Sequence, residues 1–253
     1  GLVYCAWDSA DYVTRFLPSW LEARQQRLGN HDWSICAVSV PFEGFPQGER
    51  QDETQQLLYN HHQRGEIDHF RFGVTPTKET EARGTALRWL RDEAKVDVLW
   101  MIDSDESYLL TDIAAITAFV ESQPLLCWYR VALKNLVFTP DQHVADPFTP
   151  PRIHRVKAPG TSYRAHSFYE DNGVTYGGTI TRDLIPDTSF ASMTIPKEIA
   201  WPSHWTWLNA ARSKAKVRYQ TERGWTCSFD WDDAQGGLIW RKGHEQETVK
   251  DVL

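Results

Sequence analysis

Three acidic side chains, Asp103, Asp105 and Glu106, lie close together near the middle of the chain. Asp103 and Asp105 are two positions apart, so in an extended segment their carboxylates project to the same side. Two hard oxygen ligands on one side, with room for water and phosphate oxygens, suit Mg²⁺ or Mn²⁺ carrying a diphosphate. The spacing therefore predicts a metal site, and the alternative is a solvated acidic turn.

The residues before this acidic cluster must hold it in place. Residues 96–102 are mostly bulky and apolar, which is typical of a strand buried on both faces of a parallel sheet. Ligands of such sheets bind outside the carboxyl ends of the strands, where the acids would lie. Similar patterns predict strands at 2–6, 33–40 and 69–74, and helices at 10–28 (interrupted near Pro18), 53–64, 78–93 and 111–122. This alternation predicts an α/β fold with a mostly parallel sheet flanked by helices.

The helix predicted before the acidic strand carries the sequence Ala82-Arg83. This pair, followed by an apolar strand that ends in Asp-x-Asp, resembles the GT-A glycosyltransferases, and glycosyltransferase family 2 in particular. The family pattern has Asn where this chain has Gly84. The resemblance implies a Rossmann-like GT-A domain with an acceptor-side extension. Residues 1–122 would bind the nucleotide sugar, and residues 123–253 would form the acceptor-binding half and the C-terminal tail.

The same resemblance implies a metal-dependent, hexosyltransferase-like enzyme. It would move a sugar from a nucleotide-sugar donor, expected to be UDP-linked, to a hydroxyl-bearing acceptor such as a glycan or a lipid-linked sugar. The identity of the donor sugar and of the acceptor stays open. Two other interpretations are a noncatalytic carbohydrate- or nucleotide-sugar-binding protein on the same fold and an Asp-x-Asp phosphatase. In such phosphatases the nucleophile strand normally opens the domain, whereas here strand and helix units precede it.

Further donor contacts follow from the resemblance. Asp8, after the first predicted strand, and Glu43, after the second, would accept hydrogen bonds from the base or ribose. Family members have an Asn-Glu pair and an Asp-rich loop at these places, so the nucleobase stays open. Asp103 and Ser104 of the acidic motif would also contact the donor. Arg83 would pair with a phosphate or brace Asp103, and the alternative is a surface salt bridge.

His204 lies about 100 residues beyond the acidic motif, ahead of a predicted helix. By resemblance it would be the third metal ligand, beside Asp103 and Asp105, because a neutral imidazole binds Mn²⁺ well. The alternative is an ordinary polar residue at a helix start. Its aromatic neighbours could wall a sugar pocket: Trp201, Trp205 and Trp207. The basic residues that follow are expected in a flexible loop covering the diphosphate: Lys214, Lys216 and Arg218.

Glu170 and Asp171 follow a proline-rich stretch in the second half of the chain. An inverting transferase needs a general base near the acceptor hydroxyl, and the resemblance implies paired acids in this region. The alternative is the charged rim of a hairpin that turns at Asn172-Gly173. Whether configuration is retained or inverted stays open.

Composition restricts the partners of the chain. Its 253 residues, 41% hydrophobic and 24% charged, are typical of a globular protein. A net charge of −7 argues against a surface that coats nucleic acid. A hydroxymethylated base in DNA would still be an acceptor if the basic segments 152–164 and 212–223 lined one groove. Four scattered cysteines indicate buried thiols in a reducing compartment. Without an apolar run of about 20 residues, a cytoplasmic protein with no transmembrane segment is expected.

Overall fold

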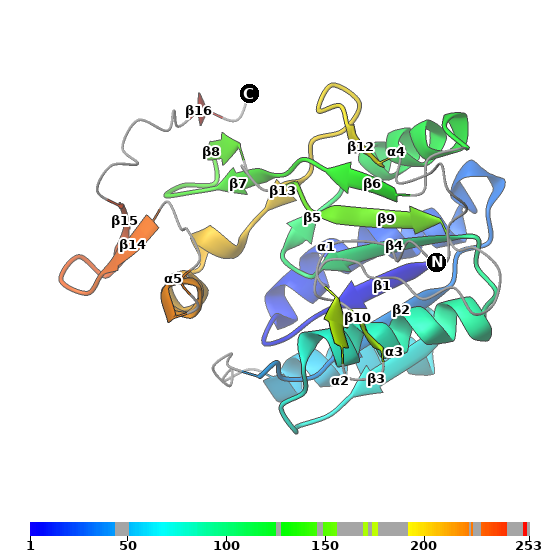
Figure 1. The fold of residues 1–253 in the computed structure, drawn as a ribbon, viewed down its shortest axis with the longest axis horizontal. Coiled ribbons are helices and arrows are strands. Elements are labelled where there is room, and N and C mark those ends of the chain that lie inside the picture. Colours follow the sequence, from blue (N-terminus) through cyan, green and yellow to red (C-terminus); the bar gives the residue numbers. More distant parts are fainter. Residues whose placement is uncertain are drawn as a thin grey trace.

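The computed structural model describes residues 1–43, 51–124, 128–145, 149–155, 169–171, 174–176, 192–222, 224, 229–241 and 250–251. Its main layer is a seven-stranded sheet with helices packed on both faces (Figure 1). Four of the strand pairs in this sheet are parallel and two are antiparallel. The predicted fold class, a mostly parallel α/β sheet flanked by helices, is therefore confirmed.

The first half of the chain alternates strand and helix as predicted. Its elements are β1 (Leu2–Cys5), α1 (Ala10–Gln25), β2 (Ile35–Ser39), α2 (Gln51–Gln63), β3 (His69–Phe72), α3 (Glu79–Asp92), β4 (Val98–Asp103), β5 (Glu106–Ser107) and α4 (Leu110–Ser122), with a short 3₁₀ turn at Leu28–Asn30. The strands β4, β1, β2 and β3 are parallel neighbours in that order. Their carboxyl ends therefore meet at one edge, where the described residues that directly follow β1, β2 and β4 lie as expected.

The second half completes the same sheet and builds a smaller one. The main sheet gains β6 (Trp128–Val131), β9 (Pro151–Arg155) and β12 (Ser192–Ile195). The smaller sheet has the order β16-β8-β7-β13-β5, from β7 (Lys134–Leu136), β8 (Gln142–Ala145), β13 (Ser203–His204) and β16 (Lys250–Asp251). Because β5 directly follows β4, the smaller sheet is anchored beside the acidic motif. The functional division at residue 122 stays a prediction.

Three further elements lie outside these two sheets. Helix α5 (Ala210–Glu222) follows a 3₁₀ turn at Thr206–Leu208 and packs against the hairpin β14 (Phe229–Asp232) and β15 (Gly237–Trp240). The hairpin β10 (Tyr169–Asp171) and β11 (Val174–Tyr176) lies against α3. These elements place the basic helix α5 near the smaller sheet and the predicted acceptor-side acids near α3.

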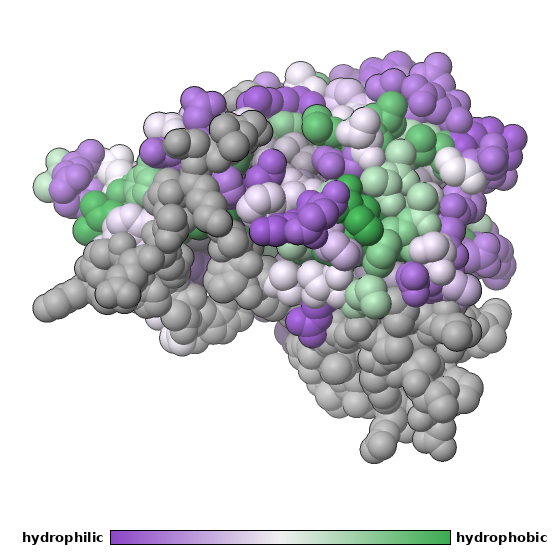
Figure 2. Space-filling view, turned by 90° about the horizontal axis from the view of Figure 1, so that it is seen from above, coloured by the Kyte–Doolittle hydropathy of each residue, from purple (hydrophilic) through white to green (hydrophobic). Residues whose placement is uncertain are grey.

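The described part of the surface carries both hydrophilic and hydrophobic residues. Figure 2 shows, on the described part of one face, hydrophobic residues in small areas between hydrophilic ones. Among the described residues, no helix combines the length and apolar character needed to cross a membrane. Cys5 and Cys36 are buried thiols, and burial raises the pKa of Cys36. The other two cysteines lie outside the described residues.

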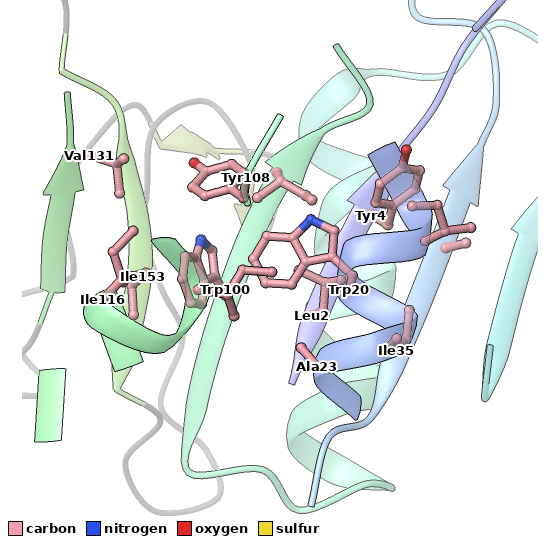
Figure 3. Close-up of a cluster of buried hydrophobic side chains, with 14 of the residues drawn as sticks. Leu2, Tyr4, Trp20, Ala23, Ile35, Trp100, Tyr108, Ile116, Val131 and Ile153 are labelled. Carbon is pink, nitrogen blue, oxygen red and sulfur yellow. The ribbon is translucent and has the colours of Figure 1, made fainter. Parts of the chain in front are cut away.

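Two tryptophans fill the core between the main sheet and helices α1 and α4. The Trp20 ring of α1 meets the Trp100 ring of β4 edge-on, with centroids 4.8 Å apart (Figure 3). Tyr108 packs against both rings, at 5.3 Å from Trp20 and 5.7 Å from Trp100. These large side chains supply buried apolar area rather than a surface for stacking sugars. They also fix β4, and with it the acidic motif, against α1.

Helix α1 corrects one expectation. It runs without interruption from Ala10 to Gln25 although Pro18 lies inside it. Proline inside a helix costs about 3 kcal/mol because it removes one hydrogen bond and crowds the preceding turn. Pro18 is exposed, while its neighbours Leu17 and Trp20 are fully buried. Burial of such side chains contributes about 1.5–3 kcal/mol each, which offsets that cost.

Candidate functional site

The smaller sheet brings His204 to the acidic motif. Strand β13 pairs antiparallel with β5, and this register sets His204 opposite Glu106. The backbone N–H of Trp205 donates to the carbonyl oxygen of Asp105 at 2.8 Å. As a result, His204 Nε2 lies 3.4 Å from Asp105 Oδ2. Two of the three predicted metal ligands are therefore adjacent, although they lie far apart in the sequence.

Asp105 is held as an anion. The hydroxyl of Thr206 donates to its Oδ2, and the carboxylate is largely buried. Burial opposes its ionisation, but the nearby His204, Lys216 and Arg212 outweigh that effect and hold its pKa well below the usual range. A carboxylate surrounded by cationic and hydrogen-bond-donating groups can bind a metal ion without first losing a proton.

Asp103 faces a different set of partners. Arg83 Nη2 donates to its Oδ1 at 2.6 Å, and Arg152 Nη2 donates to its Oδ2 at 2.9 Å. Burial disfavours the Asp103 anion, but the charges of both arginines outweigh it, so its pKa lies below the usual range. Arg83 is only 4% exposed, which excludes the surface-salt-bridge alternative and gives it the bracing contact. Both oxygens of Asp103 are thus engaged by arginines.

Glu106 and Arg152 form a buried pair that the sequence did not reveal. Arg152 Nη2 donates to Glu106 Oε1, and the Tyr108 hydroxyl donates to Oε2 at 3.1 Å. Glu106 is fully buried, and burial raises its pKa to about 7 although Arg152 acts in the opposite direction. Arg152 therefore bridges Asp103 and Glu106 and ties β9 to the acidic motif. The partners of Arg152 are set by sheet pairing, which the local sequence does not reveal.

Asp105 and His204 match part of the ligand set that a divalent ion requires. Among the described residues, no group of three His, Cys, Asp or Glu side chains is placed to hold an ion. The three-residue site of Asp103, Asp105 and His204 therefore stays a prediction. Asp105 and His204 could supply two of the ligands of an ion, with the others coming from water or substrate. Two ligands that each lie about 2.1 Å from an ion, at right angles to one another, are about 3.0 Å apart. Their separation of 3.4 Å is close to that value.

The other predicted donor-binding residues lie near the same edge with different exposures. Asp8 follows β1 with a left-handed backbone (φ 48°), and its carbonyl oxygen accepts a hydrogen bond from Arg212. Ser104 is buried, and its hydroxyl donates to Ser9 Oγ at 2.8 Å. Glu43 follows β2 and is exposed. Ser104 thus supports the loop from inside, and the donor contacts of all three stay predictions.

The basic residues after His204 correct another expectation. They lie on helix α5 rather than in a loop. Lys216 points to the site, with its Nζ 3.4 Å from His204 Nε2 and 4.9 Å from the centre of the Trp207 ring. Lys214 instead pairs with Asp233 at 2.5 Å. This segment is therefore a regular helix and not a covering loop, and its Lys216 supplies a cation at a fixed position near the acids.

The tryptophans around His204 have distinct environments. Trp207 is largely buried and packs against Phe229 at 5.2 Å, in the cluster between α5 and the β14–β15 hairpin. Trp205 donates from its indole to Ser107 Oγ at 2.9 Å and lies under the Arg15 guanidinium. Trp201 packs on His143. Trp207 is thus a packing residue, whereas Trp201 and Trp205 are partly exposed residues.

Two predictions fall partly outside the described structure. Glu170 and Asp171 lie in β10, whose backbone is beside α3, but their side chains are outside the described residues. The basic groove proposed for DNA needed Arg152 at the surface. Arg152 is 6% exposed and bound to acids, so it cannot line such a groove.

Comparison with known proteins gives distant likenesses only. No protein-family model and no curated protein matches the chain. The crystal structure of S. aureus TarS is 14% identical with a TM-score of 0.40, over 61% of this chain and 28% of that chain. TarS 1–349 in complex with UDP is 14% identical with a TM-score of 0.38, over 55% and 36%. CMP:2-keto-3-deoxy-manno-octonic acid synthetase complexed with CTP is 11% identical with a TM-score of 0.30, over 61% and 70%.

This chain thus spans less than half the length of the TarS chains that it resembles. Likenesses this distant carry no conclusion about function.

Proposed function

We propose that this protein is a metal-dependent glycosyltransferase that uses a nucleotide-sugar donor. The observation that carries the proposal is the 3.4 Å approach of Asp105 Oδ2 to His204 Nε2 at the carboxyl edge of the parallel sheet. Ligands of open α/β sheets bind at this edge. A carboxylate and an imidazole suit Mn²⁺ or Mg²⁺, and their number leaves coordination positions for phosphate oxygens and water.

In this proposal the chain's own groups bind and orient the donor diphosphate. Asp105 and His204 would hold the ion, which when bound neutralises charge on the leaving diphosphate. Lys216 supplies a second positive charge beside His204. Arg212 binds the carbonyl oxygen of Asp8 and lies over the Tyr12 ring at 4.1 Å, so it fixes the loop after β1. Asp8 and Glu43 would then contact the nucleoside from the loops after β1 and β2.

Asp103 has a supporting role in the same proposal. Because Arg83 and Arg152 engage both of its oxygens, it holds the backbone of the acidic motif while Asp105 faces the ion. The phosphatase alternative requires a carboxylate at this position that is free to attack phosphorus. The two ion pairs of Asp103 favour the transferase. On the acceptor side, Glu170 or Asp171 would remove the proton of the attacking hydroxyl.

The test is a screen of purified protein with nucleotide sugars, starting with UDP-linked ones, in Mn²⁺, in Mg²⁺ and in excess chelator. We expect release of nucleoside diphosphate that requires the metal and is lost in Asp105→Asn. The exposed residue Asp32, which pairs only with Arg27 in the described structure, gives the matched control Asp32→Asn. Tight binding of a nucleotide sugar without any turnover would favour the noncatalytic binding protein instead.

A further inference from the structure

We infer that Asn135 is a positioning residue that sets the protonation and direction of the His204 imidazole. Asn135 Oδ1 lies 2.6 Å from His204 Nδ1. A carbonyl oxygen only accepts, so this contact requires the hydrogen on Nδ1, and in the neutral imidazole the lone pair then lies on Nε2. Nε2 is the nitrogen that faces Asp105. This role rests on the proposed function, in which Nε2 binds the ion.

The contact between Nε2 and Lys216 supports this tautomer. The ammonium of Lys216 lies 3.4 Å from Nε2 and can only donate hydrogen bonds. The Thr206 hydroxyl oxygen lies 3.2 Å from Nε2 and directs its hydrogen to Asp105 Oδ2. If the amide of Asn135 were reversed, an N–H on Nε2 would be set against the Lys216 ammonium. The Lys216 contact therefore favours Nε2 as an acceptor in the neutral imidazole, which is the state that a metal ligand needs.

The fold makes Asn135 a rigid support. It lies on β7, in the interior of the smaller sheet, in register with Val144 of β8 on one side and His204 of β13 on the other. It is 7% exposed. A buried amide in an inner strand has little freedom to move, so it can hold the imidazole ring in one orientation. Partners of this kind commonly change metal affinity by 10- to 100-fold when they are removed.

The metal test uses Mn²⁺ binding followed by the electron paramagnetic resonance signal of free Mn²⁺, with and without UDP. Asn135→Leu keeps the approximate volume but removes the acceptor, and we expect affinity to fall by about 10- to 100-fold. Asn135→Asp restores an acceptor and should keep affinity within about threefold of the wild type or increase it. The control is Val144→Ala, which creates a cavity beside the adjacent strand. It should lower thermal stability without changing Mn²⁺ affinity.

A second measurement does not need the metal. Long-range ¹H–¹⁵N correlation spectra of the metal-free protein, assigned with a His204→Gln variant, should show the proton on Nδ1 in the wild type. A proton on Nε2, equal Mn²⁺ affinity in Asn135→Leu, or weak binding in Asn135→Asp would each overturn the inference. If wild-type protein binds no Mn²⁺ even with UDP, the proposed function fails. The tautomer then still decides whether Asn135 orients the ring.

Discussion

Lys216 Nζ lies 3.4 Å from His204 Nε2, and both side chains face the carboxylate of Asp105. Lys214, one half-turn earlier on the same helix, is exposed and pairs with Asp233 instead. The two lysines have the same charge but different surroundings. Comparing variants of the two lysines therefore distinguishes a local role of Lys216 in binding the donor from a general effect of the charge of the helix.

Lys216→Met should weaken binding of a nucleoside diphosphate by about 10-fold or more, since a hydrogen bond to a charged group contributes about 1.5–3 kcal/mol. Lys214→Met should change it by less than about threefold, because exposed ion pairs contribute little. Isothermal titration with UDP in Mn²⁺ measures both. Equal losses in the two variants would mean that long-range charge, not the position of Lys216, attracts the diphosphate.

Asp105→Ala should lower transfer by about 100-fold or more, because the metal's charge neutralisation is worth several kcal/mol in the transition state. The fold should persist, since the core clusters do not include Asp105. Steady-state kinetics and a thermal melt are the measurements. Collapse of the melting transition in this variant would show that Asp105 is a structural residue of the turn.

Arg152→Met should destabilise the protein by about 3–5 kcal/mol, because it leaves the buried Glu106 carboxylate without its cation. The double variant Arg152→Met/Glu106→Gln removes that charge as well and should recover part of the loss. Urea unfolding measures the free energies. If the double variant is no more stable than Arg152→Met, the loss comes from packing or from Asp103 rather than from Glu106.

The raised pKa of Glu106 predicts a pH dependence of stability. Burial raises its folded-state pKa to about 7, above the ordinary value for Glu, so the folded protein binds this proton more tightly than the unfolded chain. The stability that Glu106 contributes through this proton is fully present below the unfolded pKa of about 4.3 and is lost as pH rises through 7. Wild type should therefore lose stability relative to Glu106→Gln between about pH 4.5 and 7.

Denaturation series at intervals across this range test the Glu106 prediction. Asp103 and Asp105, with lowered pKa values, act with the opposite sign and at more acidic pH: they stabilise above the unfolded Asp pKa, and this is lost as pH falls. The pH range in which Glu106 changes stability is therefore separate from the range in which the two aspartates do. Parallel curves for wild type and Glu106→Gln would contradict the raised pKa.

The acceptor-side base is tested by the amide variants Glu170→Gln and Asp171→Asn. The variant that removes the base should lower kcat by about 100-fold or more while donor affinity stays nearly unchanged, because base catalysis acts in the transition state. The other variant should be nearly normal. Full turnover in both would place the base elsewhere or indicate retention of configuration, which the anomeric configuration of the product would resolve.

The sequence by itself determined strands β1 to β4 of the main sheet and the edge of that sheet where the predicted site lies. Apolar runs bounded by polar residues defined β1, β2 and β4, because strands buried on both faces must be apolar along their length. The acids after β4 then had to lie at the carboxyl edge. The exception was α1, where the local effect of Pro18 was outweighed by the burial of Leu17 and Trp20, a tertiary effect.

Only the tertiary structure decided which side chains meet at that edge. Asp103 and Asp105 have similar local sequence, yet β9 brings Arg152 to the first and β13 brings His204 to the second. Asn135 lay in a short strand with no motif around it, and only its register with His204 gives it a partner. Pairing between strands that are distant in sequence depends on the whole sheet, so local sequence patterns do not predict these contacts.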